Sequence, residues 1–455
     1  MDTLRFLTPE QIHEIREWYE TPVFIYSERI LREQAQKVVN FPHHFGLTPR
    51  YAMKTSSNMN LLRIFSSEGL HIDASSGYEV MRAIHAGIPP NHIQLTGQEM
   101  PRDLEKIVKM WVEFNATSLY QLETYGKLFP WTEASIRINP GMGSWGTNRT
   151  NVGWPASSFG IWHEYLDEAK STAEKYSLTI TKLHTHIWSG SDPEVWKTVA
   201  GLVLRVVEKL PHVTIVSLGW GFKVARMDYE KTAHLEEIGN HVKWLFLEFA
   251  EKTRRKLHLE VEPGTFLAAN SASLITEVID IVDTGEDGYN FIKVNSGMTE
   301  VTRPSLYGAQ HPIIVIPNMQ NPEDSQKQGV RGREIFSKGV YSSVDDWENN
   351  LSNKENRSFS ESSYIVVGHN CESGDIFTTA PGDPEWLLPR TLTEARIWDG
   401  IVIESVWSYC ASMSTHGYNS FPEAGELLLR EDGAIVEIRK RAESAELWRN
   451  EIPIV

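Results

Sequence analysis

The chain has 455 residues, more than one hydrophobic core usually supports, so we expect two domains. A formal net charge of −16 disfavours nucleic acid and anionic membranes as main partners. Two cysteines, no signal-peptide pattern and no run of about 18 apolar residues together indicate a cytoplasmic protein without disulfides or membrane-spanning helices.

The first half of the chain alternates strand-like and helical segments. Thr8, as N-cap, and Pro9, at the first helical position, predict a helix over residues 8–19, and the apolar run VFIYS predicts a strand after it. Five β-branched runs follow, and they end at Lys54 (YAMK), Ser75 (HIDAS), Gly97 (IQLTG), Ser118 (FNATS) and Asn139 (SIRIN). Their regular spacing, with helical stretches and breakers between them, is typical of successive βα units.

Three further runs come at wider spacing: KLHTHI at 182–187, VSLGWG at 216–221 and LEVEPG at 259–264. Eight strand–helix units predict an α/β protein with a closed (β/α)8 barrel of the TIM type. An open doubly wound sheet, which usually has fewer strands, is the alternative. The long loop after the fifth run carries Trp145, Trp154, Phe159 and Trp162, which predicts a packed loop near the site.

After Gly264 the pattern changes to apolar runs separated by longer polar tracts, which is typical of an antiparallel β-domain. We therefore expect residues 30–276 to form the barrel, and residues 1–29 and 277–455 to form a C-terminal antiparallel β-domain. A polar stretch near 319–362, low in aliphatic residues, predicts a surface insertion.

In a parallel barrel, the side chains at the C-terminal ends of the strands converge on one pocket. Here these positions hold Lys54, Asp73, Arg137, His184, His186, Gly219, Gly221 and Glu262. A lysine that ends an apolar strand is costly to bury unless it is paired or covalently used, and burial favours the neutral amine that attacks carbonyl groups. A lysine in a salt bridge, or one with only its stem buried, is the alternative.

Other strand-end motifs supply chemistry to match such a lysine. The HTH motif at 184–186 could place two imidazoles on a metal, but no later strand end adds a histidine, so we expect no metal. The LGWGF turn at 218–222 can present backbone N–H groups to a phosphate. The EVEPG motif places Glu262 where it can keep a pyridinium nitrogen protonated, with a structural salt bridge as the alternative.

Taken together, these motifs resemble those of the fold-type III pyridoxal-phosphate decarboxylases, the alanine-racemase-like group, and especially its diaminopimelate decarboxylases, over roughly residues 20–430. The resemblance implies pyridoxal 5'-phosphate as cofactor, held covalently by Lys54 of YAMK. It implies further cofactor contacts from Asp73, Arg137, His186 as ring stacker, Ser189, Gly219, Gly221, Glu262 at the ring nitrogen, and Tyr409.

Motifs of the second domain extend the resemblance. HNCESGD resembles a loop that reaches into the other subunit, so it implies a homodimer with shared active sites. In that loop Cys371 would return a proton to the product and Glu372 would bind the distal amine of the substrate. GMTEVTRPSLY would present Arg303 and Tyr307 to a distal carboxylate. The implied reaction is decarboxylation of a basic amino acid, first of all meso-diaminopimelate to lysine and carbon dioxide, in lysine biosynthesis.

Two departures from the family pattern concern the substrate pocket. Thr265 stands where the family has an arginine, and Trp220 interrupts its glycine turn. The Thr265 substitution favours, as the alternative, D-lysine, D-ornithine or a carboxylated amine of siderophore or polyamine synthesis as substrate. A racemase of this fold would use a tyrosine in place of Cys371, and a regulatory relative would have lost Lys54 or Cys371, so both are disfavoured.

Overall fold

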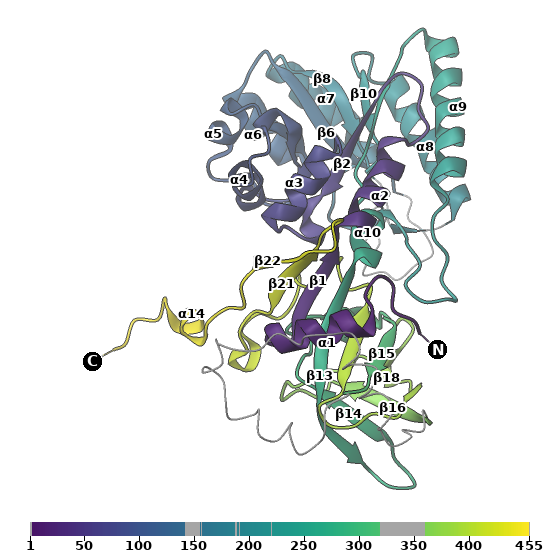
Figure 1. Ribbon diagram of the computed structural model, residues 1–455. Coiled ribbons are helices and arrows are strands. Elements are labelled where there is room, and N and C mark those ends of the chain that lie inside the picture. The colour runs from purple at the N-terminus through teal and green to yellow at the C-terminus, as the bar shows by residue number, and fades with distance from the viewer. Residues whose placement is uncertain are drawn as a thin grey trace.

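The computed structural model describes residues 2–141, 155, 157–186, 189–190, 192–219, 221–318 and 360–454. Figure 1 shows a barrel above and a sheet domain below, with both chain ends beside the sheet domain. The predicted insertion at 319–362 lies outside the described residues except for its last three positions, and Trp145 and Trp154 also lie outside them.

Eight parallel strands close into the predicted barrel. They are β2 (Leu47–Ala52), β3 (His71–Ala74), β4 (Ile93–Leu95), β5 (Glu113–Ala116), β6 (Glu133–Asn139), β8 (Thr179–His184), β10 (Ile215–Ser217) and β12 (His258–Val261). Strand β5 pairs with β6 and β12 pairs with β2, which completes the circle. The barrel prediction is therefore confirmed, and the open sheet is excluded.

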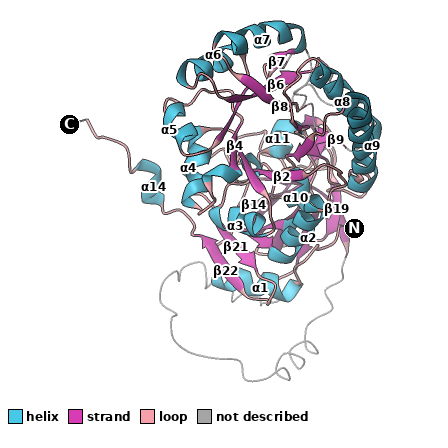
Figure 2. Ribbon diagram, turned by 90° about the horizontal axis from the view of Figure 1, so that it is seen from above, coloured by secondary structure: helices cyan, strands magenta, loops and turns pink. Residues whose placement is uncertain are grey.

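Helices surround these strands (Figure 2). The α-helices of this half are α2 (Glu28–Val39), α3 (Met59–Ser67), α4 (Gly77–His85), α5 (Leu104–Lys109), α6 (Leu119–Leu128), α7 (Leu166–Lys175), α8 (Pro193–Glu208), α9 (Leu235–Thr253) and α10 (Thr265–Ala268). Single 3₁₀ turns are η1 (Met53–Thr55), η2 (Pro90–His92), η3 (His163–Tyr165) and η4 (Ala269–Ser271), and the short strand β7 (Ile161–Trp162) extends the sheet beside β6. Ser76 and Ser118 cap α4 and α6 directly after β3 and β5, so the chain turns at each strand end.

The second sheet has nine strands: β1 (Val23–Ser27), β13 (Ala272–Asp283), β14 (Asn290–Val294), β15 (Ile313–Ile316), β16 (Glu361–Val367), β19 (Arg390–Thr393), β20 (Gly400–Glu404), β21 (Gly425–Leu429) and β22 (Ile435–Arg439). Most neighbours are antiparallel, as expected, but β1 pairs parallel with β21 and β14 pairs parallel with β16. The strand predicted at VFIYS therefore belongs to this sheet. Smaller elements are β17 (Thr379–Ala380), β18 (Asp383–Leu387), α11 (Arg303–Tyr307), η5 (Tyr418–Ser420) and α14 (Ser444–Trp448).

Helix α1 (Pro9–Trp18) confirms the first predicted helix. The Thr8 side chain accepts from the Gln11 backbone N–H and the Gln11 side chain accepts from Thr8, so the helix begins with a capping box. Its buried face, Ile12 and Ile15, packs on the sheet beside Ile25 of β1. The helix thus covers one face of the second sheet (Figure 1).

The two halves meet in a buried aromatic cluster that we call the junction cluster: Tyr26, Tyr51, Phe65 and Trp407. The Tyr26 and Trp407 rings lie edge to face at 4.6 Å, and the Tyr51 and Phe65 rings lie 4.3 Å apart. The Trp407 indole N–H donates to the Tyr51 hydroxyl at 3.2 Å. Dry aromatic contacts of this kind hold the segment after β20 firmly against the end of β2.

Candidate active site

Lys54 lies in the tight turn η1, two residues beyond the end of β2. The turn is held from both halves of the protein. Tyr409 N–H donates to the Thr55 carbonyl at 3.1 Å, and the Ser412 hydroxyl contacts the carbonyls of Lys54 at 3.1 Å and Thr55 at 2.8 Å. The side chain of Lys54 itself is exposed, so the expectation of a buried amine is wrong. The reason is that the turn points it into an open cavity, while Met53 and Thr55 are buried on either side.

That cavity lies at the C-terminal ends of the barrel strands. Its described lining consists of Ala52, Lys54, Asp73, Ser75, Thr96, Arg137, His184, His186, Gly221, Glu262, Gly264, Thr265 and Tyr409. Six different barrel strands end at these positions or just before them, which is why residues so far apart in sequence meet. The convergence predicted from the strand ends is therefore observed, and Tyr409 enters the cavity from the second half of the chain.

Glu262 is the most strongly bonded carboxylate of the cavity. Its side chain accepts from His184 Nε2 at 2.8 Å, from the Ser217 hydroxyl at 2.8 Å and from Gln94 Nε2 at 2.9 Å. Burial opposes ionisation, but these donors and the nearby cations hold the pKa of Glu262 well below its usual range. A carboxylate has about four acceptor positions, so one remains for a further donor.

Asp73 and Arg137 line the same cavity as Glu262. Burial and the Glu262 carboxylate raise the pKa of Asp73 to about 8. Arg137 is buried, its guanidinium lies 5.1 Å from the centre of the Phe159 ring, and desolvation lowers its pKa to about 10. Phe159, one of the loop aromatics, therefore packs at the site as predicted.

The histidines of the HTH motif have different surroundings. Burial lowers the pKa of His184, and the ring donates from Nε2 to Glu262. Desolvation, with Lys54 and Arg137 nearby, lowers the pKa of His186 well below its usual range. Both rings are thus neutral and flat partners for a ligand. Within the described ranges, no group of three histidine, cysteine, aspartate or glutamate side chains could hold a metal ion.

The Gly219 end of the glycine turn lies beside Glu262. Gly219 has φ +64°, and a Cβ there would lie 2.6 Å from the Thr185 carbonyl oxygen. Gly221 begins β11 (Gly221–Phe222), which pairs with β9 (Ser189–Gly190) so that Gly221 lies opposite Ser189. The side chain of Ser189 and the whole of Trp220 lie outside the described residues. Only glycine fits at position 219, because any Cβ would clash with the Thr185 carbonyl and the His186 ring.

The predicted substrate residues lie in a second place. Glu372 lines an open pocket with Met298, Ser305, Ser373, Gly374, Ile376, Pro384, Glu385, Leu387, Thr415 and Tyr418. Cys371 is exposed beside it, and its backbone N–H donates to Asn419 Oδ1 at 2.7 Å. Among the described lining residues, the pocket of Glu372 shares none with the Lys54 cavity.

Arg303 and Tyr307 begin and end the short helix α11. Both are half-buried, and the Arg303 guanidinium lies 5.9 Å from the Tyr307 ring centre. The buried Nε of Arg303 has no hydrogen-bond partner among the described residues. A buried cationic donor of this kind is costly unless an anion reaches it.

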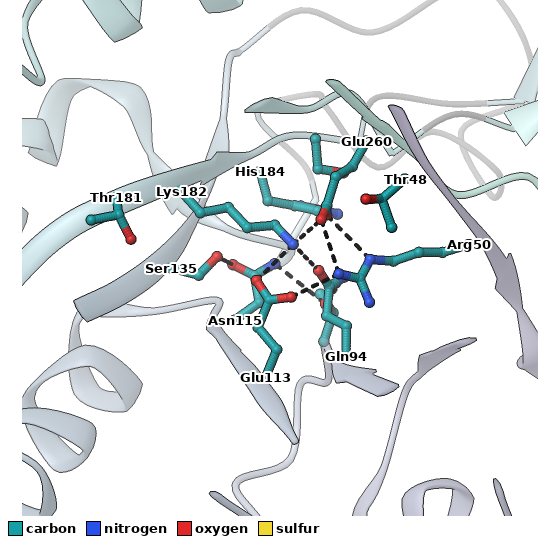
Figure 3. Close-up of polar contacts among 12 residues, drawn as sticks. Thr48, Arg50, Gln94, Glu113, Asn115, Ser135, Thr181, Lys182, His184 and Glu260 are labelled. Carbon is teal, nitrogen blue, oxygen red and sulfur yellow. Dashed lines mark hydrogen bonds and ion pairs between the residues drawn. The ribbon is translucent and has the colours of Figure 1, made fainter. Parts of the chain in front are cut away.

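Sequence reasoning missed Gln94 and Ser217, two of the three side chains that donate to Glu262. It also missed the charged side chains inside the barrel, Arg50, Glu113, Lys182 and Glu260, which Figure 3 shows facing one another. A signal was present, because each of these polar residues interrupts a short apolar run that forms a strand. A barrel interior filled by aliphatic layers would not carry them.

The residues of the cavity fit pyridoxal phosphate. Lys54 offers an amine, Glu262 keeps one acceptor position for a ring nitrogen, and the glycine turn lines the cavity at Gly221, where backbone can meet a phosphate. The Glu262 backbone N–H also donates to the Gly219 carbonyl, so the acid and the turn are held as one unit. The carbonyl carbon, the phosphate and the ring nitrogen of the cofactor would thus each meet a matching group.

Comparisons with known proteins agree with this arrangement. Residues 28–269 match the family model of the pyridoxal-dependent decarboxylases, pyridoxal binding domain. Diaminopimelate decarboxylase of Escherichia coli K12 is 29% identical over 98% of this chain and 97% of its own, and that of Buchnera aphidicola subsp. Schizaphis graminum is 30% identical over 96% and 95%.

Solved structures give the same result. A crystal structure of diaminopimelate decarboxylase superposes with a TM-score of 0.83 at 27% identity, covering 98% of this chain and 97% of that one. The Helicobacter pylori enzyme, complexed with L-lysine, has a TM-score of 0.77 at 26% identity, covering 96% and 98%. The chain therefore belongs to the pyridoxal-dependent decarboxylases, carbon–carbon lyases that use pyridoxal 5'-phosphate.

Proposed function

We propose that this enzyme decarboxylates meso-diaminopimelate, with lysine and carbon dioxide as products. The observation that carries the proposal is the single cavity that joins Lys54, Asp73, Arg137, His186 and Glu262. The substrate assignment is supported by relatives named diaminopimelate decarboxylase that match this chain over almost their full length.

Different cavity residues would hold different parts of the cofactor. Lys54 would hold the cofactor covalently through its carbonyl carbon, and the flat His186 ring would pack against it. Glu262 accepts a hydrogen bond from the ring nitrogen and so stabilises the protonated form of that nitrogen. When bound, pyridoxal phosphate withdraws the electron pair that the departing carboxylate leaves on the substrate carbon.

The polar residues around the ring fix its position. Backbone N–H groups near Gly219 and Gly221, with Ser189 and the Tyr409 hydroxyl, hold the phosphate. Arg137 and Asp73, which line the same cavity, would contact the ring as well. This many contacts keep the bond to the leaving carboxylate in one orientation, which is how an enzyme selects decarboxylation over competing reactions.

The far end of the substrate meets the second half of the protein. Arg303 and Tyr307 bind the distal carboxylate, in keeping with the unpartnered Arg303 Nε, and Glu372 binds the distal amine. The Cys371 thiol donates a proton to the carbon that has lost its carboxylate. A thiol in this role must stay reduced, and both cysteines are free, in keeping with a cytoplasmic enzyme.

We further propose a homodimer with shared active sites. Glu372 lines a pocket whose described lining shares no residue with the Lys54 cavity of the same chain, so we expect Glu372 and the neighbouring Cys371 to reach that cavity from a second copy. The exposure of the Cys371 loop leaves it available for such a contact. Two-fold pairing would let each loop serve the partner's cavity.

Carbon dioxide release from a panel of amino acids tests the substrate. We expect meso-diaminopimelate to be preferred over D-lysine and D-ornithine by about tenfold to a hundredfold, since a carboxylate pairs with Arg303 through charge-assisted bonds. The Lys54→Ala variant is the matched control and should release none. Equal or faster release from D-lysine would replace the proposal by the alternative that Thr265 favours, because that threonine lines the cavity where relatives carry an arginine.

A further inference from the structure

A cluster of opposite charges fills the middle of the barrel. We call Arg50, Glu113, Lys182 and Glu260 the interior charge cluster. Arg50 contacts Glu260 at 2.9 Å and Glu113 at 2.8 Å, and Lys182 contacts Glu113 at 2.7 Å and also pairs with Glu260 (Figure 3). Arg50, Lys182 and Glu260 are all buried. None of these four side chains belongs to the described lining of the Lys54 cavity.

Gln94 lies between the interior charge cluster and the carboxyl groups of the cavity. The side chain is fully buried, with 0% of its surface exposed. On one side the Lys182 ammonium donates to Gln94 Oε1. On the other side Gln94 Nε2 donates to Glu262 Oε1 at 2.9 Å, Asp73 Oδ1 at 3.1 Å and Thr96 Oγ1 at 2.9 Å.

Lys182 determines which way this amide faces. A glutamine amide has a donor end and an acceptor end. If it turned over, the N–H groups would face the Lys182 ammonium and the carbonyl oxygen would face the ionised Glu262 carboxylate. Both contacts would then be repulsive in a dry interior, where polar mismatches are costly. The lysine therefore holds the amide with its donors toward the cavity.

We infer that Gln94, oriented by Lys182, is a positioning residue that holds the Glu262 carboxylate as a fixed acceptor toward the cofactor. It never touches the cofactor, because the lining of the cavity passes through Glu262 and Asp73 and does not include Gln94. Its donation also occupies Glu262 Oε1 together with Ser217, which leaves Oε2, bonded to His184, as the oxygen with an unused acceptor position. The inference rests on the proposed role of Glu262 at the ring nitrogen.

A purely structural role for Gln94 predicts something different. In that case its loss would lower the stability of the barrel but would leave the Glu262 carboxylate unchanged as an acceptor. Gln121 provides the matched comparison. It is also a buried glutamine, 2% exposed, and its amide donates to the backbone carbonyls of Gly97 and Gln98, away from Glu262.

The experiment compares Gln94→Met with Gln121→Met in the purified enzyme. Two quantities are measured: the dissociation constant of pyridoxal phosphate, and the pH midpoint of the visible absorption band of the bound cofactor. We expect Gln94→Met to weaken cofactor binding about tenfold, as loss of one hydrogen bond to a charged group does. The pH midpoint should shift by about one unit. Gln121→Met should lower the thermal unfolding midpoint and change neither quantity.

Lys182→Met provides a second, independent variant. Without the ammonium the amide can turn over, so the same shift in the pH midpoint should appear, and adding Lys182→Met to Gln94→Met should not enlarge it. Unchanged cofactor affinity and pH midpoint in Gln94→Met would overturn the inference. Because the readouts concern cofactor binding, a wrong substrate assignment would leave them untouched, so the two failures are distinguishable.

Discussion

Asp73 illustrates how one residue couples the site to pH. It is buried beside the ionised Glu262, and these two causes raise its pKa to about 8, far above the usual range of an aspartate. The folded protein therefore binds one more proton at Asp73 than the unfolded chain does between about pH 4 and pH 8. Because the folded state holds the extra proton, its stability decreases as the pH rises through this window.

We predict this dependence for the cofactor-free protein. Urea unfolding at pH values from 5 to 8 should show the free energy of unfolding falling with pH, with Asp73 contributing up to about 1.4 kcal/mol per pH unit. Asp73→Asn should remove that contribution and flatten the curve. A variant curve with the same slope as the parent protein would show that Asp73 is not the group responsible.

The barrel strands are joined through their interior side chains as well as their backbones. Arg50 lies on β2, Glu260 on β12 and Glu113 on β5, so the interior charge cluster links strands on opposite sides of the barrel. Burial of these ions is costly, and pairing offsets the cost only while all partners are present. The strands of this barrel are therefore sensitive to the loss of any one member.

Arg50→Met tests this at the level of the strands. We expect a loss of about 3–5 kcal/mol in the free energy of unfolding, since the variant leaves two carboxylates short of a partner. Arg29→Met is the control, because Arg29 forms an exposed pair with Glu33 one helical turn away and should contribute less than about 0.5 kcal/mol. Equal effects in both variants, measured by urea unfolding, would rule out a special role for the buried cluster.

For the whole molecule, the proposed dimer predicts complementation between two inactive variants. Lys54→Ala and Cys371→Ala each damage a different half of a shared site. Mixed and allowed to exchange subunits, they should regain about a quarter of parental activity, because half of the dimers are mixed and each mixed dimer has one intact site of two. Two affinity tags verify that exchange has occurred. Activity that stays at zero in verified mixed dimers would contradict shared sites.

Much of the architecture could be predicted from local patterns. The strand runs and their breakers predicted eight barrel strands: the first five end within two residues of the observed ends, and the last three end within four. Thr8 and Pro9 predicted α1. No helix in the described ranges is long and apolar enough to cross a membrane, as the hydropathy pattern predicted. These features depend on residues near one another in sequence, where propensity and capping act.

The convergence of Lys54, Asp73, Arg137 and Glu262 followed from the sequence alone, because parallel strands in a barrel must present their C-terminal ends to one cavity. Only the tertiary structure decided the exposure, the hydrogen-bond partners and the charge states of those groups. The exposure of Lys54, the donors of Glu262 and the placement of Glu372 in a second pocket all depend on contacts between distant segments. Burial and hydrogen bonding set charge states, and both arise only when the chain has closed around the site.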